Sequence, residues 1–149
     1  MFNELLNRIP KDEPDLKIGS LYLWVSGYND PSQMNQGDLA YLNTPTLLVA
    51  EDTVVFSKTS DTPVFILKEF LKDIVKMYEN ISVSNVAEFS SHESEFSLRL
   101  TSNDLGHIKI NVAYNAWTHD GRFEFEETID QSYLPSIIAS LKMVIQKFG

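Results

Sequence analysis

The chain has 149 residues and no cysteine, and its 21 acidic residues outnumber 12 basic ones to give a formal net charge of −9. The length fits one ordinary domain, and the 43% hydrophobic content can close one core without disulfides or metal. The lack of cysteine excludes a disulfide framework, a thiolate zinc site and a cysteine nucleophile, and the negative charge disfavours binding to nucleic acid or anionic lipid.

A short N-terminal arm, residues 1–16, is expected to lead into a core over residues 17–148, within one domain that takes in the whole chain. No basic segment followed by an apolar run marks a secretory signal here, and no stretch approaches the roughly 18–20 apolar residues of a membrane span. We therefore expect a cytoplasmic protein. Helical spacing predicts one amphipathic turn in the arm, formed by Phe2, Leu5, Leu6 and Ile9.

Three strands are predicted in the first half of the core. Residues 16–28 read as one strand with two apolar faces, covered on both sides, with Trp24 in the core. Residues 39–50 have strand composition interrupted at Pro45, which is typical of an edge or a bulge. A tight turn of two acidic residues then leads into a strand over residues 53–58.

A first helix is predicted with Thr62 as its N-cap and Pro63 as its first residue, because the N–H group that proline lacks would be unpaired at that position anyway. Asn80 is expected to end this helix. Apolar residues recur at helical spacing and predict a buried stripe. The stripe consists of Leu67, Phe70, Leu71, Ile74, Val75 and Tyr78.

From residue 83 onward the pattern has period two, which predicts an antiparallel meander with one apolar and one solvated face. A strand over residues 83–89 opens it, and an Asp-Gly turn at residues 119–121 predicts its last hairpin. The alternating apolar residues of the later strands are Phe96, Leu98, Leu100, Ile108, Ile110, Val112, Phe123 and Phe125.

The chain is predicted to end in a second helix, capped by Asp130 or Ser132, with Pro135 in its first turn. Its apolar stripe is interpreted as the face that covers the sheet: Leu134, Ile137, Ile138, Leu141, Val144, Ile145 and Phe148. The predicted fold class is α+β, a largely antiparallel sheet of six to seven strands in a meander with two main helices packed on it.

The sequence contains no recognisable catalytic, cofactor-binding or metal-binding constellation. His92, His107 and His119 are too widely spaced for a compact ligand motif and read as surface or turn residues. Glycines form no phosphate-binding loop, and basic residues are not clustered with aromatic ones as in nucleic-acid-binding proteins. We therefore predict no enzyme, no cofactor, no metal and no direct nucleic-acid partner.

Acidic residues on the predicted strands are the best candidates for partner binding. Glu124 and Glu126 share one side of a strand, about 7 Å apart at Cα, while Glu127 points to the other side. Acid–base catalysis would need a pocket that raises one pKa, so a solvated face is favoured. With Glu95 nearby, the two residues would form an acidic patch that mimics phosphates to a nuclease, and Trp117 is a candidate interface anchor.

Residues 104–112 read DLGHIKINV and residues 123–135 read FEFEETIDQSYLP. Together they resemble the WapI-type immunity protein family of bacteria, in which a Leu-Gly-His strand precedes a second strand. That second strand ends in a Glu-Thr-Asp-Gln-Ser/Thr-Tyr-Leu-Pro run that opens the last helix. Ile129 separates Thr128 from Asp130 here, which departs slightly from the family's run.

The resemblance covers about residues 17–148 and implies both a structural and a functional role. The Tyr133-Leu134-Pro135 run would cap the last helix and place an aromatic ring in the core. The protein would bind and neutralise a cognate polymorphic toxin in the cell that makes it, without catalysis. A basic nuclease is one kind of toxin domain that the net charge would attract.

Two alternatives stay open at this point. An enzyme acting on a small metabolite would need a polar pocket that holds a perturbed carboxylate or histidine. A structural or assembly module would use a sheet edge or Trp117 to oligomerise. The acidic surface could also serve solubility alone, and the sequence leaves the toxin, the contact face and the oligomeric state open.

Overall fold

The computed structural model describes residues 2–58, 60–81, 83–93, 95–115 and 121–148. Within them the strands form three antiparallel sheets with two long helices, so the predicted α+β class is confirmed, while three sheets replace the single predicted one. The elements are α1 (Phe2–Leu6), β1 (Leu16–Ile18), β2 (Leu21–Leu23), β3 (Gly27–Tyr28), η1 (Pro31–Asn35), η2 (Gly37–Leu39), β4 (Tyr41–Asn43), β5 (Thr46–Ala50), β6 (Thr53–Ser57), β7 (Asp61–Pro63), α2 (Val64–Glu79), β8 (Val86–Ser90), β9 (Phe96–Ser102), β10 (His107–Asn115), β11 (Arg122–Asp130), η3 (Gln131–Tyr133) and α3 (Leu134–Phe148).

The predicted meander is the largest sheet of the protein, with strand order β11-β10-β9-β8, and we call it the large sheet. Its strands alternate as expected, so every second side chain enters the core. The Asp-Gly turn predicted at residues 119–121 falls largely outside the described residues. The buried side chains of this inner face are Ala87, Phe89, Phe96, Leu98, Leu100, Ile108, Ile110, Val112 and Tyr114.

The prediction of one strand over residues 16–28 is wrong. Gly19 adopts a φ of +56°, a left-handed conformation that glycine tolerates, and the chain turns back there. As a result β1 and β2 form a tight hairpin in which Leu16 lies opposite Leu23. This hairpin belongs to a second sheet with the order β1-β2-β5-β6, which we call the small sheet. Trp24 follows it and is buried, as predicted.

The predicted break at Pro45 separates two strands that belong to different sheets. β4 pairs with β3 and β7 in a three-stranded sheet, and β5 pairs with β2 and β6 in the small sheet. The Pro45 carbonyl accepts a hydrogen bond from the backbone N–H of Trp24 at 3.0 Å, which holds the connection against the end of β2.

The first long helix, α2, begins at Val64, so the prediction of Thr62 as its N-cap is wrong. Thr62 instead lies in β7 opposite Leu42, and its hydroxyl is buried 2.7 Å from that of Thr44. Pro63, predicted as the first helical residue, is itself extended, with φ −63° and ψ 144°, and occupies the N-cap position, so the helix begins one residue later than predicted.

The buried side of α2 follows the predicted stripe except at its end. Phe70 and Ile74 are fully buried, but Tyr78 is 49% exposed and Met77 takes its place in the core. Met77 is three residues after Ile74 and seven after Phe70, which is the spacing of one helix face. Asn80 ends the helix as predicted, and its N–H donates to the Lys76 carbonyl at 3.1 Å.

The last helix, α3, is preceded by the short turn η3. Asp130 caps that turn by accepting the Ser132 N–H at 2.8 Å, as predicted. Tyr133 is 58% exposed, so the expectation that its ring enters the core is wrong. The turn directs Tyr133 outward, and Leu134 is the fully buried residue instead. The other residues of α3 that are buried are Ile137, Leu141 and Val144.

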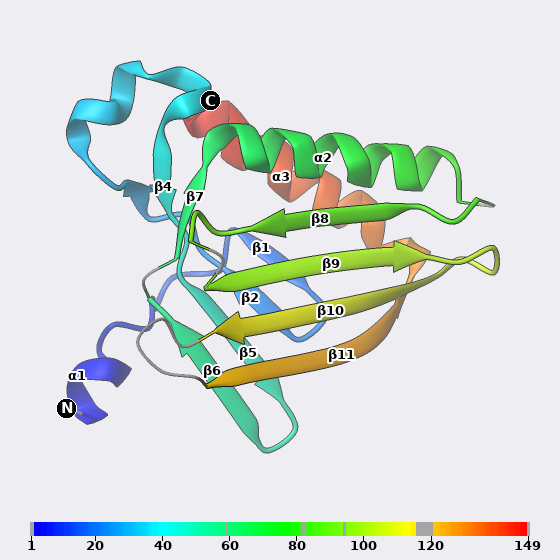
Figure 1. The fold of residues 1–149 in the computed structure, drawn as a ribbon, viewed down its shortest axis with the longest axis horizontal. Coiled ribbons are helices and arrows are strands. Elements are labelled where there is room, and N and C mark those ends of the chain that lie inside the picture. Colours follow the sequence, from blue (N-terminus) through cyan, green and yellow to red (C-terminus); the bar gives the residue numbers. More distant parts are fainter. Residues whose placement is uncertain (1, 59, 82, 94, 116–120, 149) are drawn as a thin grey trace.

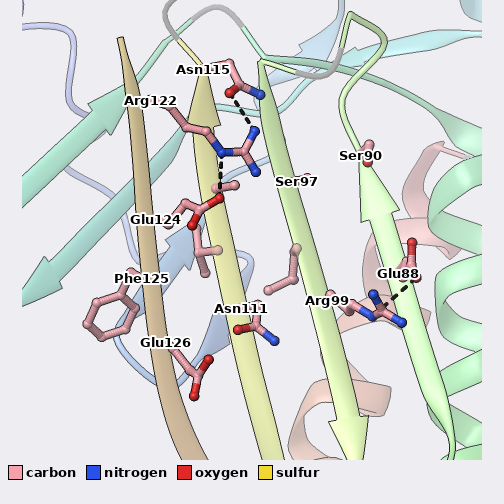
Figure 2. Close-up of a pocket in the computed structure, with 13 residues that line it drawn as sticks. Glu88, Ser90, Ser97, Arg99, Asn111, Asn115, Arg122, Glu124, Phe125 and Glu126 are labelled. Atoms are coloured by element: carbon pink, nitrogen blue, oxygen red, sulfur yellow. Dashed lines mark hydrogen bonds and ion pairs between the residues drawn. The ribbon is translucent and has the colours of Figure 1, made fainter.

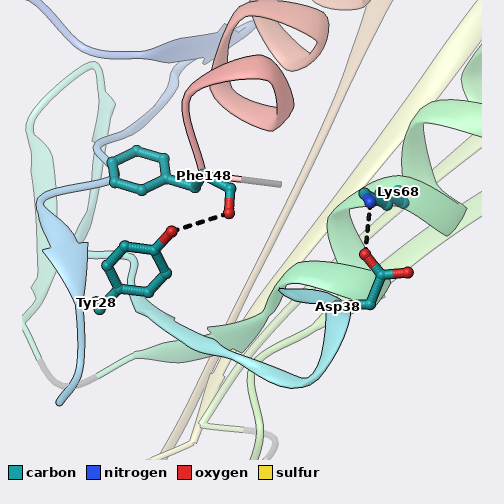
Figure 3. Close-up of polar contacts among 4 residues, drawn as sticks. All are labelled: Tyr28, Asp38, Lys68 and Phe148. Atoms are coloured by element: carbon teal, nitrogen blue, oxygen red, sulfur yellow. Dashed lines mark hydrogen bonds and ion pairs between the residues drawn. The ribbon is translucent and has the colours of Figure 1, made fainter. Parts of the chain in front are cut away.

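Figure 1 shows the large sheet in front, with the small sheet and α3 behind it and α2 running along β8. Among the described residues, no helix is both long and apolar enough to cross a membrane. Two contacts hold the edges of this arrangement (Figure 3). The Tyr28 hydroxyl donates to the Phe148 carbonyl at 3.1 Å, and Lys68 pairs with Asp38 at 2.5 Å between α2 and η2.

Two polar contacts join the small sheet to the large one. Glu127 faces inward, opposite to its neighbours as predicted, and accepts hydrogen bonds from the Ser20 N–H at 2.5 Å and the Ser20 hydroxyl at 2.8 Å. A Cβ atom at Gly19 would lie 1.8 Å from Glu127 Oε1, so only glycine fits this approach. Further along, the hydroxyls of Thr46 in β5 and Tyr114 in β10 lie 2.9 Å apart in the core.

Candidate functional site

The outer face of the large sheet carries polar and charged side chains in register across four strands. Because side chains alternate along each strand, the residues between the buried ones all point to this side. One row across the sheet consists of Glu88, Arg99, Asn111 and Glu126, and the next row consists of Ser90, Ser97, Ala113 and Glu124.

Three ion pairs organise this face. Arg122 Nε lies 2.6 Å from Glu124 Oε1, and Arg122 Nη1 donates to Asn115 Oδ1 at 2.9 Å (Figure 2). Arg99 Nε lies 3.4 Å from Glu88 Oε1 across β8 and β9. Opposite charges therefore lie next to one another on the solvent-exposed face of these strands.

The third ion pair shows that the face is not a uniform acidic patch. Lys109 Nζ lies 3.8 Å from Glu126 Oε1, so each of the two glutamates predicted as a patch has a basic partner. We call the outer surface of the large sheet the mixed-charge face. Its paired residues are Glu88, Arg99, Lys109, Arg122, Glu124 and Glu126.

These ion pairs are exposed and therefore weak. The side chains of the three pairs are 54–66% exposed, and such pairs contribute about 0–1 kcal/mol each to stability. A partner can therefore exchange them for its own charges at little cost to the fold. The alternating signs favour a partner whose charges alternate in a matching pattern.

A depression of about 620 Å³ lies in the middle of the mixed-charge face. It is lined by the small side chains of Ser90, Ser97 and Ala113, with Arg99 and Arg122 at its sides (Figure 2). Short side chains between long charged ones leave room for a protruding group of a partner.

The structure places the four predicted partner-binding residues differently. Glu124 and Glu126 lie on the mixed-charge face, as the alternation requires. Glu95 is half-buried at one end of the sheet, where its carbonyl accepts the Asn115 N–H at 2.8 Å. Trp117 lies outside the described residues.

The basic residues of this face were not singled out from the sequence. Arg99, Lys109 and Arg122 each occupy a polar position in an alternating segment, which indicates the outer side of a strand. Arg122 pairs with Glu124 two residues along the same strand. The pairing of Arg99 and Lys109 with glutamates depends on the register between strands, which the alternation of one strand does not give.

Other titratable groups lie apart from the mixed-charge face, and the described residues contain no cluster that could hold a metal ion. His92 is exposed and packs edge-on against Tyr41, with ring centroids 4.8 Å apart. The backbone N–H of His92 donates to the Asp61 carbonyl at 2.7 Å. Burial raises the pKa of the Asp61 carboxyl. His107 is exposed at the start of β10, opposite Asp130.

A second depression of about 460 Å³ lies where the β1–β2 hairpin meets β11 and the start of α3. Lys17, Asp130, Tyr133 and Ser136 line it. The sequence does not indicate this site, because the family resemblance places the Tyr133 ring in the core.

The solved structures that match this chain include two distant likenesses. The "Crystal structures of trypanosoma bruciei MRP1/MRP2" contain a chain with 12% identity and a TM-score of 0.44, covering 98% of this chain and 92% of that one. The "CdiA-CT/CdiI toxin and immunity complex from Enterobacter cloacae" contains one with 18% identity and a TM-score of 0.40, covering 68% and 88%. Likenesses of this size say nothing about function.

Comparison with protein families gives a clear result, although no curated protein matches the chain. The match covers residues 15–149, which include both long helices and all three sheets. It takes in the two segments on which the family resemblance rested, residues 104–112 and 123–135. The chain belongs to the immunity protein WapI-like family.

Proposed function

We propose that this protein neutralises a cognate bacterial toxin domain by direct binding, without catalysis, and that the mixed-charge face is its contact surface. The observation that carries the proposal is membership of the immunity protein WapI-like family over residues 15–149. Membership of this family identifies neither the toxin nor the activity of the toxin.

The chemistry of the mixed-charge face supports its choice as the contact surface. Its charged groups are held in register by a sheet, which makes it a pre-organised pattern and lowers the cost of ordering side chains on binding. The net charge of −9 speeds encounter with a basic partner, such as a nuclease domain. After encounter, the alternating signs would fix the orientation of the partner.

The direct test is calorimetry of the purified protein with the toxin-like domain encoded immediately upstream of it, at low and moderate salt. We expect nanomolar binding that weakens as salt rises, because salt screens exposed charges. A basic nuclease of unrelated fold and similar charge serves as the control for non-specific attraction. Equal binding to both proteins, or none to the toxin domain, would contradict the proposal.

A second measurement tests neutralisation itself. Expression of the toxin domain in the cytoplasm, where we place the protein, should arrest growth, and co-expression of this chain should restore it. A complex that forms in vitro but gives no rescue would show that binding leaves the toxin's active surface free.

A further inference from the structure

The outer face of the small sheet is apolar over β2, β5 and β6, unlike that of the large sheet. Lys17 of β1 lies opposite Tyr22, at the side of this face away from β6. Tyr22, Leu47 and Phe56 lie side by side across β2, β5 and β6, and Val49 lies opposite Val54. Val54 is 62% exposed and Val49 is 40% exposed. An exposed apolar group of this kind marks an interaction surface more often than isolated apolar residues do.

The edge strand β6 lacks the features that normally protect a sheet edge. Natural edge strands carry charges, proline or bulges that block pairing with another chain. β11 carries Arg122 and three glutamates, and α2 packs along β8. In contrast β6 reads TVVFS, with no charge and no proline. Figure 1 shows that the β5–β6 hairpin extends beyond the rest of the fold.

The register of this hairpin identifies the backbone groups that point outward. Its turn has two residues, so Ala50 and Thr53 close it as a hydrogen-bonded pair. Hydrogen-bonded and non-hydrogen-bonded pairs then alternate along β5 and β6. Val54 and Phe56 belong to non-hydrogen-bonded pairs, so their backbone N–H and C=O groups point away from β5, to the free edge. Among the described residues, no backbone group pairs with them on that side.

We propose that β6 pairs with β6 of a second copy of this chain, antiparallel and about a two-fold axis at Val55. In this register Val54 lies opposite Phe56 of the second copy, so the outward-pointing backbone groups of both chains match. The two four-stranded small sheets become one continuous sheet of eight strands. Such an interface is isologous and closes as a dimer.

Charge complementarity argues for a second copy rather than for another strand. The same register places the exposed residues Asp52 and Lys58, just beyond the ends of β6, each opposite the other in the second copy. Two symmetric ion pairs thus flank the apolar centre, and opposite charges directly across strands are favourable. If the second β6 strand were shifted by two residues, Asp52 and Lys58 would no longer lie opposite each other and the paired segment would be shorter.

The pairing leaves the mixed-charge face uncovered, because that face belongs to the large sheet. Dimerisation and toxin binding can therefore be tested independently. Failure of one would leave the other standing.

The first test is sedimentation velocity of the full chain over a concentration series from micromolar to millimolar, at an ionic strength that screens the net charge. We expect a monomer–dimer equilibrium. Val54→Lys places a charge on the edge and should give a monomer throughout the series. Val83→Lys is the matched control, since Val83 is 57% exposed outside the small sheet, and it should dimerise like the wild type. A monomeric wild type, or a dimer that survives Val54→Lys, would overturn the proposal.

The second test separates self-pairing from pairing with a strand of a different protein. Asp52→Lys and Lys58→Glu should each weaken the dimer by at least about tenfold, because each places like charges opposite one another. The double variant restores opposite charges in the homodimer and should recover dimerisation. If the double variant were as weak as the single ones, the two-fold register would be wrong.

Discussion

The large and the small sheet each bury one face in the same core, but their other faces differ. The large sheet exposes three ion pairs to solvent, whereas the small sheet exposes apolar side chains on β2, β5 and β6 and an edge strand without charge. The first surface suits a specific partner with a charge pattern, and the second suits another strand. One chain of −9 net charge thus offers two chemically separate surfaces.

The contact of Gly19 and Ser20 with Glu127 joins the two sheets, and one added methyl group at Gly19 should have the largest effect on stability that we expect. Gly19→Ala adds a Cβ that meets Glu127 Oε1 at 1.8 Å and strains a φ of +56°. We expect a loss of about 3 kcal/mol in urea unfolding, from the left-handed conformation and the broken charged hydrogen bonds. Gly37→Ala, with φ +58° and open space around it, should lose only the conformational part, about 1 kcal/mol. Equal losses would show that the two sheets are not joined there.

The buried Thr46–Tyr114 contact joins the sheets at a second point and predicts a pH effect. Burial raises the pKa of Tyr114 to about 12, against a partial opposing effect of its hydrogen bond to Thr46. The folded state then holds the phenol proton more tightly than the unfolded state, so stability falls as pH rises from about 10 to about 12. The loss should reach about 2–3 kcal/mol, and Tyr114→Phe should lack it. A variant that follows the same pH profile would contradict this assignment.

How far the sequence predicts the fold differs between the two halves of the chain. The meander and α3 follow from simple periodicity, because each strand from β9 to β11 alternates over seven to nine residues. The N-terminal strands have two to five residues, which is too short for a period to show. Their turns depend on single residues such as Gly19. The single-domain prediction stays a prediction.

The hairpin of the small sheet carries a local strain that a glycine would remove. Glu51 has a φ of +51° in a two-residue turn, where glycine is preferred. Glu51→Gly should raise the free energy of unfolding by about 1 kcal/mol or less. Asp52→Gly, at the adjacent position without a positive φ, should give no gain. A loss in both variants would mean that the turn is held by contacts other than its backbone.

The ion pairs of the large sheet should matter little for stability. Arg99→Ala removes the 3.4 Å pair with Glu88 and should change the free energy of unfolding by less than about 1 kcal/mol. Chemical unfolding measures this directly. A larger loss would show that the outer surface supports the fold and is not available for exchange with a partner.

The candidate site was predictable in part for a physical reason. The alternation in β11 places Glu124 and Glu126 on the solvated side from sequence alone. The basic partner of Glu124 is Arg122, two residues earlier in the same strand. The basic partner of Glu126 is Lys109, 17 residues earlier, and only strand register brings these two together. The apolar face of the small sheet is not predictable from the sequence for a related reason, since the pattern of residues 16–28 predicts one strand covered on both sides.

The most direct test of the central claim is the affinity of a charge-reversed variant for the cognate toxin domain. Glu124→Lys with Glu126→Lys inverts the acidic half of the mixed-charge face, while Glu69→Lys with Glu79→Lys makes the same change in net charge on exposed positions of α2. We predict that the first pair raises the dissociation constant by about 100-fold or more, which is about 2.8 kcal/mol, and that the second pair raises it far less. Equal effects of the two pairs would contradict the assignment of the toxin-binding surface to the large sheet.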